Sequence, residues 1–345
     1  MKKILILFCA CLMMYQINAQ TTYIVSNNPA ANGGSSTIWF DNFQAAHDAA
    51  SAGDILMIQP NGTSYGDIDI TKALTIIGAG FNLGSNANAP QTNAASSKFG
   101  QVVIQEAGAG TVLMGLEITG RCYIRGDGSI VQRNKIKAVA IDDANNVTLG
   151  QNWIYSYWYL GFGDDYGGLF ITGQSENMYV HNNYIYGSTN GDYSVELASG
   201  TTMSGIFKNN VIRRGCYAVN TVFENNIFMD GPYPNTTSNA YYNNILRTAD
   251  NTHPLTGVNG NIVNAGEIES IFAAVSGNLT TYYTLVANSP ALGAGADGTD
   301  CGVFGGTEPY IPSGVPPIPV IYFLEAPTNA IGGNMEIQIK ARSNN

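Results

Sequence analysis

The chain has 345 residues, of which 45% are hydrophobic and only 12% are charged, and its formal net charge is −10. A negative charge of this size repels nucleic acid, anionic membranes and uronic-acid polymers, unless basic groups cluster locally or calcium bridges the contact. Composition therefore argues against a nucleic-acid partner and favours a neutral or weakly charged ligand.

Residues 1–19 have the composition of a secretory signal peptide. Two lysines precede an apolar run at 4–14, and the small residue Ala19 marks a cleavage site. The run is too short to span a membrane, and no later apolar stretch is long enough to do so. We expect cleavage after Ala19 and a secreted protein, either extracellular or at the cell surface. Cys11 leaves lipoprotein processing as the alternative.

The first structural elements after the leader are a helix and a polar loop. The Ala-rich segment 41–52 predicts a helix that begins at Asp41 or Asn42 and ends before Gly53. We expect this helix to cover one open end of a strand stack. Residues 82–100 are small and polar, which predicts a surface loop between early strands.

A short repeat dominates the centre of the chain. Its clear copies are HNNYI (181–185), KNNVI (208–212), ENNIF (224–228) and YNNIL (242–246), and weaker copies are RNKI (133–136), QNWI (151–154) and GNIV (260–263). The aligned asparagines are Asn134, Asn152, Asn183, Asn210, Asn226, Asn244 and Asn261. Asparagine tolerates a left-handed corner between strands, and stacked asparagine side chains can bond to one another along the axis.

Units this short can bury an apolar face only by stacking on one another. The repeat therefore predicts an all-β fold, a parallel β-solenoid. Its inward column is expected to be Ile136, Ile154, Ile185, Ile212, Phe228, Leu246 and Val263. Helical repeats are excluded because the chain lacks long runs with a period of 3.6 residues.

Two insertions break the regular spacing of the repeat. They are centred on YSYWYLGFGDDYGG (155–168) and GSTNGDYSVELASG (187–200). Insertions into repeats map to loops, often on the functional face. Because these two belong to neighbouring rungs, we expect them to wall one side of a groove.

The end of the chain changes character. Residues 311–320 are Pro-rich and cannot continue a solenoid, and the tail alternates apolar and polar residues at 335–340, which predicts a strand lying back on the body. We expect a leader at 1–19, one domain at 20–310, and a linker with a tail at 311–345. Three cysteines follow the leader without metal-like spacing, and we interpret Cys122, Cys216 and Cys301 as small apolar core residues.

The chain resembles right-handed parallel β-helix proteins, the pectate-lyase-like superfamily in its broad sense, over roughly residues 21–310. The resemblance rests on FDNFQAAHDAASAGDILMIQPNGTSYGDIDITKALTIIGAG (40–80), on the repeat, and on SPALGAGADGTDCGVFGG (289–306). It implies a right-handed parallel β-helix with a short N-terminal capping helix and a closing rung at 289–306, with Cys301 in an aliphatic position. The superfamily includes lyases, hydrolases, epimerases and adhesins, so activity stays open.

One candidate column lies two residues before each aligned asparagine. It comprises Gln132, Gly150, His181, Lys208, Glu224, Tyr242 and Asn259. His181, Lys208 and Glu224 would stack on consecutive rungs and could serve as base, activator and acid. The favoured interpretation is an ordinary solvated ladder in which Lys208 pairs with Glu224.

A second candidate column lies three residues after each aligned asparagine and points outward. It comprises Lys137, Tyr155, Tyr186, Arg213, Met229 and Arg247. Tyrosine and tryptophan rings stack on sugars, so the predicted ligand-binding residues are Trp153, Tyr155, Tyr157, Trp158, Tyr159, Tyr186 and Tyr193. Cross-strand pairing on a wet sheet face is the equally weighted alternative.

The insertions also carry carboxylates. Asp164, Asp165, Asp192 and Glu196 could form a calcium site or a paired-carboxylate acid and base, although their spacing matches no fixed metal motif. The bland alternative is that these residues are solvated loop carboxylates.

The favoured function is binding of extracellular polysaccharide through an aromatic groove by a monomer, with no clear catalytic motif. The alternative is a polysaccharide lyase or glycoside hydrolase. Similarity to alginate and chondroitin-sulfate lyases, which use a lysine and an arginine near calcium, implies Lys208 with Arg213 or Arg214 as catalytic residues. The Arg-x-Pro-x-x-Arg pattern of classical pectate lyases and the polygalacturonase motifs are absent.

Overall fold

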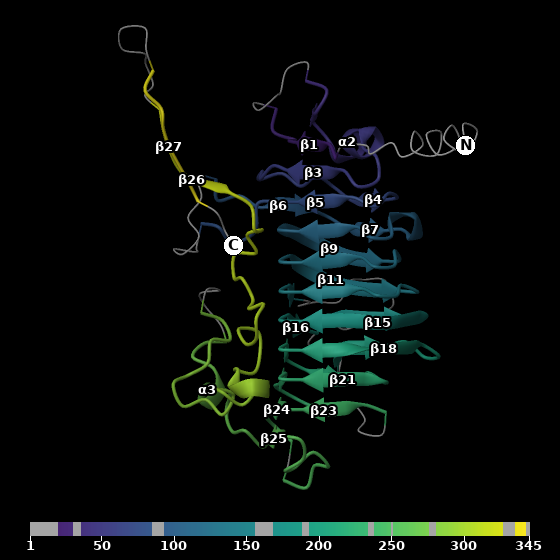
Figure 1. Ribbon diagram of the computed structural model, residues 1–345, viewed down its shortest axis with the longest axis vertical. Helices are drawn as coiled ribbons and strands as arrows, with labels where there is room; N and C mark the ends of the chain where they lie inside the picture. Colours follow the sequence, from purple (N-terminus) through teal and green to yellow (C-terminus); the bar gives the residue numbers. More distant parts are fainter. Residues whose placement is uncertain are drawn as a thin grey trace, which may run out of the picture.

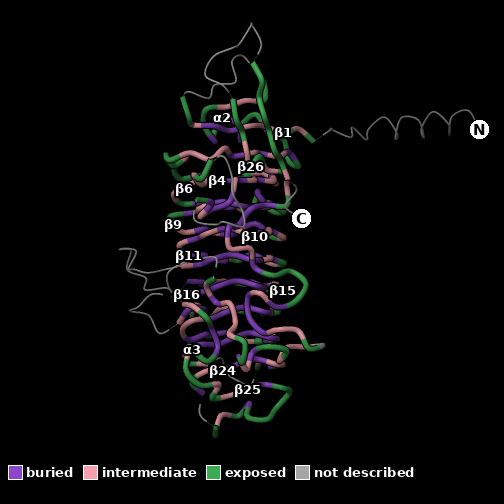
Figure 2. The backbone as a smooth tube through the Cα atoms, turned by 90° about the vertical axis from the view of Figure 1, so that its left-hand side faces the viewer, coloured by how far each residue is buried: buried purple, intermediate pink, exposed green. Residues whose placement is uncertain are grey.

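The computed structural model describes residues 20–29, 36–84, 93–155, 168–187, 193–233, 238–249, 251–275, 281–326 and 335–342. Within these ranges, two long parallel sheets, sheet A and sheet B, wind around one continuous core (Figure 1). Buried backbone runs along the stack and exposed backbone gathers at its two ends (Figure 2). The predicted parallel β-helix is confirmed.

Sheet A forms one face of the stack. In spatial order its described strands are β2 (Trp39–Phe40), β1 (Thr22–Val25), β3 (Ile55–Ile58), β5 (Thr75–Ile77), β8 (Val112–Met114), β10 (Ile130–Gln132), β12 (Thr148–Gly150), β15 (Gln174–His181), β18 (Thr202–Lys208), β21 (Thr221–Glu224) and β23 (Ala240–Tyr242).

Sheet B supplies two further faces, because β9 (Leu116–Ile124) and β11 (Lys135–Asp142) bend from one face to the other, with a register shift between Ile136 and Ala138. The face that follows the asparagine corners contains β6 (Ser97–Phe99), β13 (Trp153–Tyr155), β16 (Tyr184–Tyr186), β19 (Val211–Ile212), β22 (Ile227–Phe228), β24 (Ile245–Leu246) and β25 (Ile262–Val263). The other contains β4 (Ile68–Ile70), β7 (Val102–Ile104), β14 (Leu169–Thr172), β17 (Tyr193–Leu197) and β20 (Gly215–Cys216).

Helices are few in the described ranges. The predicted capping helix is α2 (Phe43–Ala49), and it begins where Asn42 Oδ1 accepts a hydrogen bond from the Ala45 N–H. Its Phe43 packs edge-on against Phe99, so α2 covers the first rungs of the core. The other helices are η1 (Glu106–Gly108), α3 (Ile268–Ile271) and η2 (Ala296–Gly298). Among the described residues, no helix has the length and hydropathy of a membrane span.

The predicted inward column is confirmed by the strand register. Ile136, Ile154, Ile185, Ile212, Phe228, Leu246 and Val263 are consecutive partners along sheet B. The first six are almost completely buried, and Val263 packs on the core at its end. The cysteines are buried free thiols as predicted, and burial raises the pKa of Cys122 to about 12.

The second asparagine of each corner belongs to a hydrogen-bond ladder along the stack. Asn183 is typical: its Nδ2 donates to Leu149 O at 2.8 Å and to Asn210 Oδ1 at 3.1 Å, while its Oδ1 accepts from Asn152 N at 2.9 Å. The same contacts recur from Asn134 to Asn261. The ladder satisfies the polar groups that each corner buries.

The residue before each ladder asparagine has a different role. Arg133, Gln151, Asn182, Asn209, Asn225 and Asn243 have φ between +50° and +57°. This left-handed conformation turns the chain between sheets, and asparagine adopts it more readily than other residues with a side chain. These side chains are then available to the outside of the stack.

The C-terminal part of the chain uses these corner residues to bind along the side of the stack. We call residues 296–316 the strap. The strap contacts six successive corners. From the last corner to the first, its hydrogen bonds are Cys301 Sγ to Asn243 O, Ala296 N to Asn225 Oδ1, Asn209 Nδ2 to Asp300 O, Asn182 Nδ2 to Gly305 O, Gln151 Nε2 to Glu308 O, and Arg133 Nη1 to Val315 O. Figure 1 shows this segment returning toward the first rungs.

The expectation that 289–306 forms a closing rung is therefore wrong. The glycine-rich segment forms turns and η2 rather than a strand, and the last solenoid strand in the described residues is β25. Its carbonyl groups find donors in the corner side chains, and its apolar residues cover an apolar outer face of sheet B. Cys301 is buried in that outer cluster.

The tail differs from the predicted single strand on the body. β26 (Val320–Glu325) and β27 (Gln338–Arg342) pair as an antiparallel hairpin. Figure 1 shows this hairpin projecting from the stack. The alternating pattern at 335–340 correctly indicated a strand, but its partner is β26.

We predict that Asn210→Ala lowers the free energy of unfolding by at least about 3 kcal/mol, because it removes the side-chain partner of three buried groups, the Asn183 N–H, Asn183 Nδ2 and Val180 O. Urea unfolding followed by circular dichroism measures the loss. Asn251→Ala, at an exposed position, is the matched control and should change stability by less than about 0.5 kcal/mol. Equal stability of the two variants would contradict a stabilising ladder.

Candidate functional site

The outer face of sheet A carries a continuous column of side chains. From the first rung to the last its members are Trp39, Ile24, Met57, Ile77, Met114, Gln132, Gly150, His181, Lys208, Glu224 and Tyr242. The predicted stacking of the members from Gln132 to Tyr242 is thus confirmed. The column is apolar near the N-terminal rungs and polar or charged further along.

His181 is the most enclosed polar residue of this column, with 4% of its surface exposed. Its ring stacks on Tyr179 of the same strand, with 4.4 Å between centroids and 17° between planes. It also lies over Gly150 of the preceding rung, where a Cβ atom would come within 2.5 Å of Nε2. Gly150 is therefore needed for His181 to fold over the strand.

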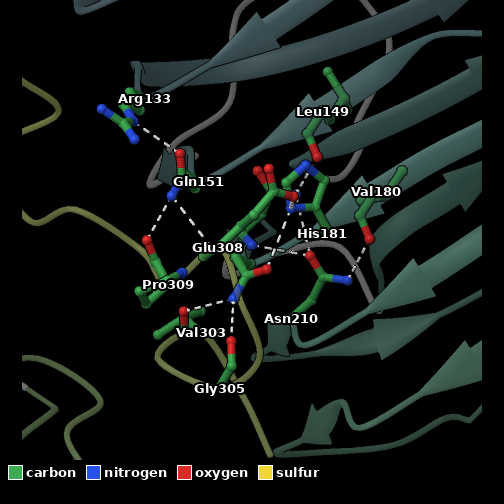
Figure 3. A network of polar contacts seen from close by, with 12 residues as sticks. Arg133, Leu149, Gln151, Val180, His181, Asn210, Val303, Gly305, Glu308 and Pro309 are labelled. Carbon is green, nitrogen blue, oxygen red and sulfur yellow. Dashed lines mark hydrogen bonds and ion pairs between the residues drawn. The ribbon is translucent and has the colours of Figure 1, made fainter. Parts of the chain in front are cut away.

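The hydrogen bonds around His181 determine which ring nitrogen carries the proton (Figure 3). Asn182 Nδ2 donates to the carbonyls of Val303 and Gly305, so Asn182 Oδ1 faces His181 Nδ1 at 3.2 Å. Nδ1 is consequently the donor and Nε2 has the lone pair in the neutral ring. Burial lowers the pKa of His181, while Asn182 and Glu308 oppose that shift, so the ring is neutral at pH 7.

The strap completes this cluster. Glu308 Oε2 lies 3.6 Å from His181 Nδ1, and Gln151 Nε2 donates to the Glu308 carbonyl. Arg133 donates to Gln151 Oε1 at 2.8 Å and to Val315 O at 3.2 Å. Because His181 is enclosed between β15 and the strap, its contacts hold the strap against the stack. It lacks the access to a polymer that a general base needs.

Lys208 and Glu224 form the predicted pair. Their Nζ and Oε1 atoms are 2.8 Å apart, and both side chains are partly exposed. Exposed pairs of this kind contribute about 0–1 kcal/mol. The interpretation of these two residues as a cross-strand ladder is confirmed.

Arg213 is enclosed by tyrosines. Its guanidinium lies 4.5 Å from the Tyr186 ring centroid and bonds Tyr184, which accepts a 2.6 Å hydrogen bond from Tyr283. Although burial opposes its charge, contacts with Tyr184, Tyr283 and Tyr186 raise the pKa of Arg213 above its ordinary value. Arg213 therefore remains a cation that holds C-terminal residues against sheet B.

The predicted aromatic strip lies outside the solenoid core but is covered. Trp153 and Tyr186 are only 7% and 5% exposed, because they belong to a second apolar cluster with Tyr283, Val303 and Tyr310. A cavity of about 10 Å³ among these side chains has room for a water-sized molecule rather than a sugar. Tyr155 is partly exposed, and Lys135 Nζ lies 5.3 Å from its ring centroid.

Trp153 and Tyr186 therefore do not line the open groove that the sequence indicated. From Asn152 onward, the residue directly after each ladder asparagine is also aromatic or aliphatic, as in Trp153, Tyr184, Val211 and Ile227. A strand that is apolar on both faces is buried on both faces. That pattern was the available signal that a further layer covers this part of sheet B.

One predicted aromatic residue, Tyr193, contacts an exposed tyrosine at a different place. Tyr193 of β17 and Tyr217, just after β20, have ring centroids 6.1 Å apart, and Tyr217 is 44% exposed. Arg214 directly precedes Gly215, the strand partner of Tyr193, and its N–H donates to Ser194 Oγ at 2.9 Å. Tyr217 falls outside the aligned columns, so only the β17–β20 pairing reveals it.

The other predicted site residues are placed as follows. Tyr157, Trp158, Tyr159, Asp164, Asp165 and Asp192 lie outside the described residues. Glu196 is partly buried on β17, opposite Phe170. Where the chain is described, no group of three or more His, Cys, Asp or Glu side chains could hold a metal ion.

The chain was compared with protein families, curated proteins and solved structures. No protein family model and no curated protein matches the chain. Among solved structures, the chain is similar to the "Crystal structure of pectate lyase Pel9A", at 12% sequence identity and a TM-score of 0.43, covering 83% of this chain and 96% of that chain. The long parallel sheets themselves establish the architecture. The fold is a parallel β-helix.

We predict that the stability of the protein falls as the pH drops below about 6.5, the ordinary pKa of histidine. Because burial lowers the pKa of His181 in the folded state, the unfolded chain binds the proton first. Its stabilising contribution is complete above the unfolded pKa and is lost as pH falls toward the folded one. Urea unfolding between pH 5 and pH 8 should show a shallower dependence for His181→Gln than for wild type. Identical slopes would contradict this role.

Proposed function

We propose that the protein is secreted or displayed at the cell surface and binds extracellular polysaccharide. The observation that carries this proposal is the pair Tyr193 and Tyr217, with ring centroids 6.1 Å apart; Arg214 directly precedes Gly215, the strand partner of Tyr193. We call these three residues the tyrosine surface. The two rings come from neighbouring rungs, which are about 4.8 Å apart.

The chemistry of the tyrosine surface suits a sugar chain. The faces of tyrosine rings stack on the C–H faces of pyranose rings, and the phenol oxygen can bond hydroxyl groups. Arg214 is partly exposed, and a guanidinium can donate several hydrogen bonds to hydroxyls or to a carboxylate. Tyr193 also lies within the predicted insertion at 187–200, and insertions in solenoids often border binding faces.

Binding is favoured over catalysis by the state of the predicted catalytic residues. Lys208 Nζ lies 2.8 Å from Glu224 Oε1, so its ammonium group is already engaged by a neighbouring carboxylate. Arg213 has a raised pKa and is enclosed by tyrosines, which works against proton abstraction. Arg214 alone lies on the tyrosine surface, so the lyase alternative depends on this residue, with calcium held by the predicted loop carboxylates.

We predict that Tyr217→Ala weakens retention on an immobilised extracellular polysaccharide about fivefold, since stacking on one aromatic ring contributes on the order of 1 kcal/mol. Affinity electrophoresis of the protein lacking residues 1–19 measures this across neutral and uronic-acid polymers, with and without calcium. Tyr242→Ala is the matched control, because Tyr242 is similarly exposed at the far end of sheet A.

The same samples are assayed for unsaturated product by ultraviolet absorbance and for new reducing ends. Retention without product supports the proposed function. Full retention by Tyr217→Ala would contradict it. Unsaturated product that disappears in Arg214→Ala would replace binding by lyase activity.

A further inference from the structure

A groove of about 380 Å³ lies between the first rungs of sheet A and the start of the tail. Its lining comprises Ser26, Asn28, Trp39, Met57, Ile58, Gln59, Pro60, Ile77, Gly78, Ala79, Asn93 and residues 318–321. We infer that this groove is a separate subsite for a neutral segment of glycan. The inference deepens the proposed function, on which it rests, and concerns residues distant from the tyrosine surface.

The floor of the groove is an apolar platform. Trp39, Met57 and Ile77 belong to the outer column of sheet A, and strand pairing fixes their order along the stack through Ile24. All three are partly exposed, although each is a large apolar residue. Such a platform, with an indole at one end, matches the apolar C–H face of a sugar ring.

The rim of the groove offers neutral polar groups. Asn28 and Gln59 lie just beyond the carboxyl ends of β1 and β3, and Asn93 lies across from them. Asn93 is fixed by its own contacts, because its Nδ2 donates to Pro60 O at 3.3 Å and its Oδ1 accepts from Ala95 N at 2.9 Å. Side-chain amides both donate and accept, which suits the hydroxyl groups of a sugar.

The charge of the groove selects among glycans. None of the lining residues that the structure describes is ionisable. A uronate or sulfate group would lose hydration here without meeting a cation, and it would also oppose the net charge of −10. The groove therefore favours neutral sugars, in contrast to the tyrosine surface, which includes Arg214. Its volume lies within the range of roughly 300–1,000 Å³ that is usual for small-molecule sites.

Residues 318–321, at the start of the tail, form one wall of the groove and are anchored to the solenoid. Immediately before them, Val315 packs on Leu83 in a small apolar cluster with Ala79 and Val320, and Arg133 holds the Val315 carbonyl. Pro316 lies so close to Gly115 that a side chain at position 115 would clash with the proline ring. The contacts of Val315 and Pro316 thus fix the position of residues 318–321, where the hairpin begins.

The groove contains its own reporter, the Met57 methyl group. We would label methionine methyls with carbon-13 in the protein lacking residues 1–19 and assign Met57 with Met57→Leu. Neutral tetrasaccharides of glucose, mannose and xylose and a tetrasaccharide of galacturonate would then be titrated. Buried Met178 and Met203 serve as internal controls. We expect neutral sugars to shift Met57 saturably while leaving the control methyls in place.

Substitutions separate this inference from the proposed function. Trp39→Ala should weaken the Met57 titration at least tenfold, and Tyr217→Ala should leave it unchanged. Circular dichroism and the control methyls verify that the variants fold. Polysaccharide retention without any Met57 shift would overturn the groove subsite while leaving the proposed function intact. A Met57 shift caused by galacturonate in preference to neutral sugars would overturn the ligand class. Absence of both retention and shift would overturn both proposals.

Discussion

The asparagine ladder is the contact on which the rest of this structure depends. A tight corner between two sheets places main-chain N–H and C=O groups inside the stack, where leaving them without partners is costly. A carboxamide has two donors and an acceptor, and at Asn183 all of them are used within the distance of adjacent rungs. An aspartate would lack the donors at that position. Because each amide bonds the next, the position of one corner fixes the position of its neighbours.

The corner dipeptide also explains how one repeat builds two layers. Its second residue faces the core and joins the ladder, and its first residue turns the chain in a left-handed conformation and presents a side chain outside. Asn182 and Asn209 use those outer amides to hold the strap. The apolar outer face of sheet B is thereby closed, and the accessible positions for a ligand shift to the outer face of sheet A and to the tyrosine surface.

The sequence predicted the features that join neighbouring repeats, and it did not predict those that join distant parts of the chain. The inward column, the ladder and the pairing of Lys208 with Glu224 involve neighbouring rungs, so aligned repeats were sufficient. The strap was missed because its glycine-rich segment has no period, and Glu308 reaches His181 only through the path of the whole chain. Apolar residues on both faces of the strands around Tyr184 indicated that a further layer covers them. The groove brings together the first four strands of sheet A and residues 318–321, which no local pattern connects.

The strap changes how this solenoid can come apart. In a simple repeat array each unit contacts only its neighbours, so the ends fray and unfolding spreads as a local event. Here one segment bonds corners from Asn243 to Arg133, and its last contact joins residues 182 positions apart in the chain. Unfolding of the C-terminal rungs therefore also weakens the hold of the strap on the N-terminal rungs, which makes unfolding cooperative. The strap also follows every rung it binds in the chain, so it docks after they exist and secures the completed stack.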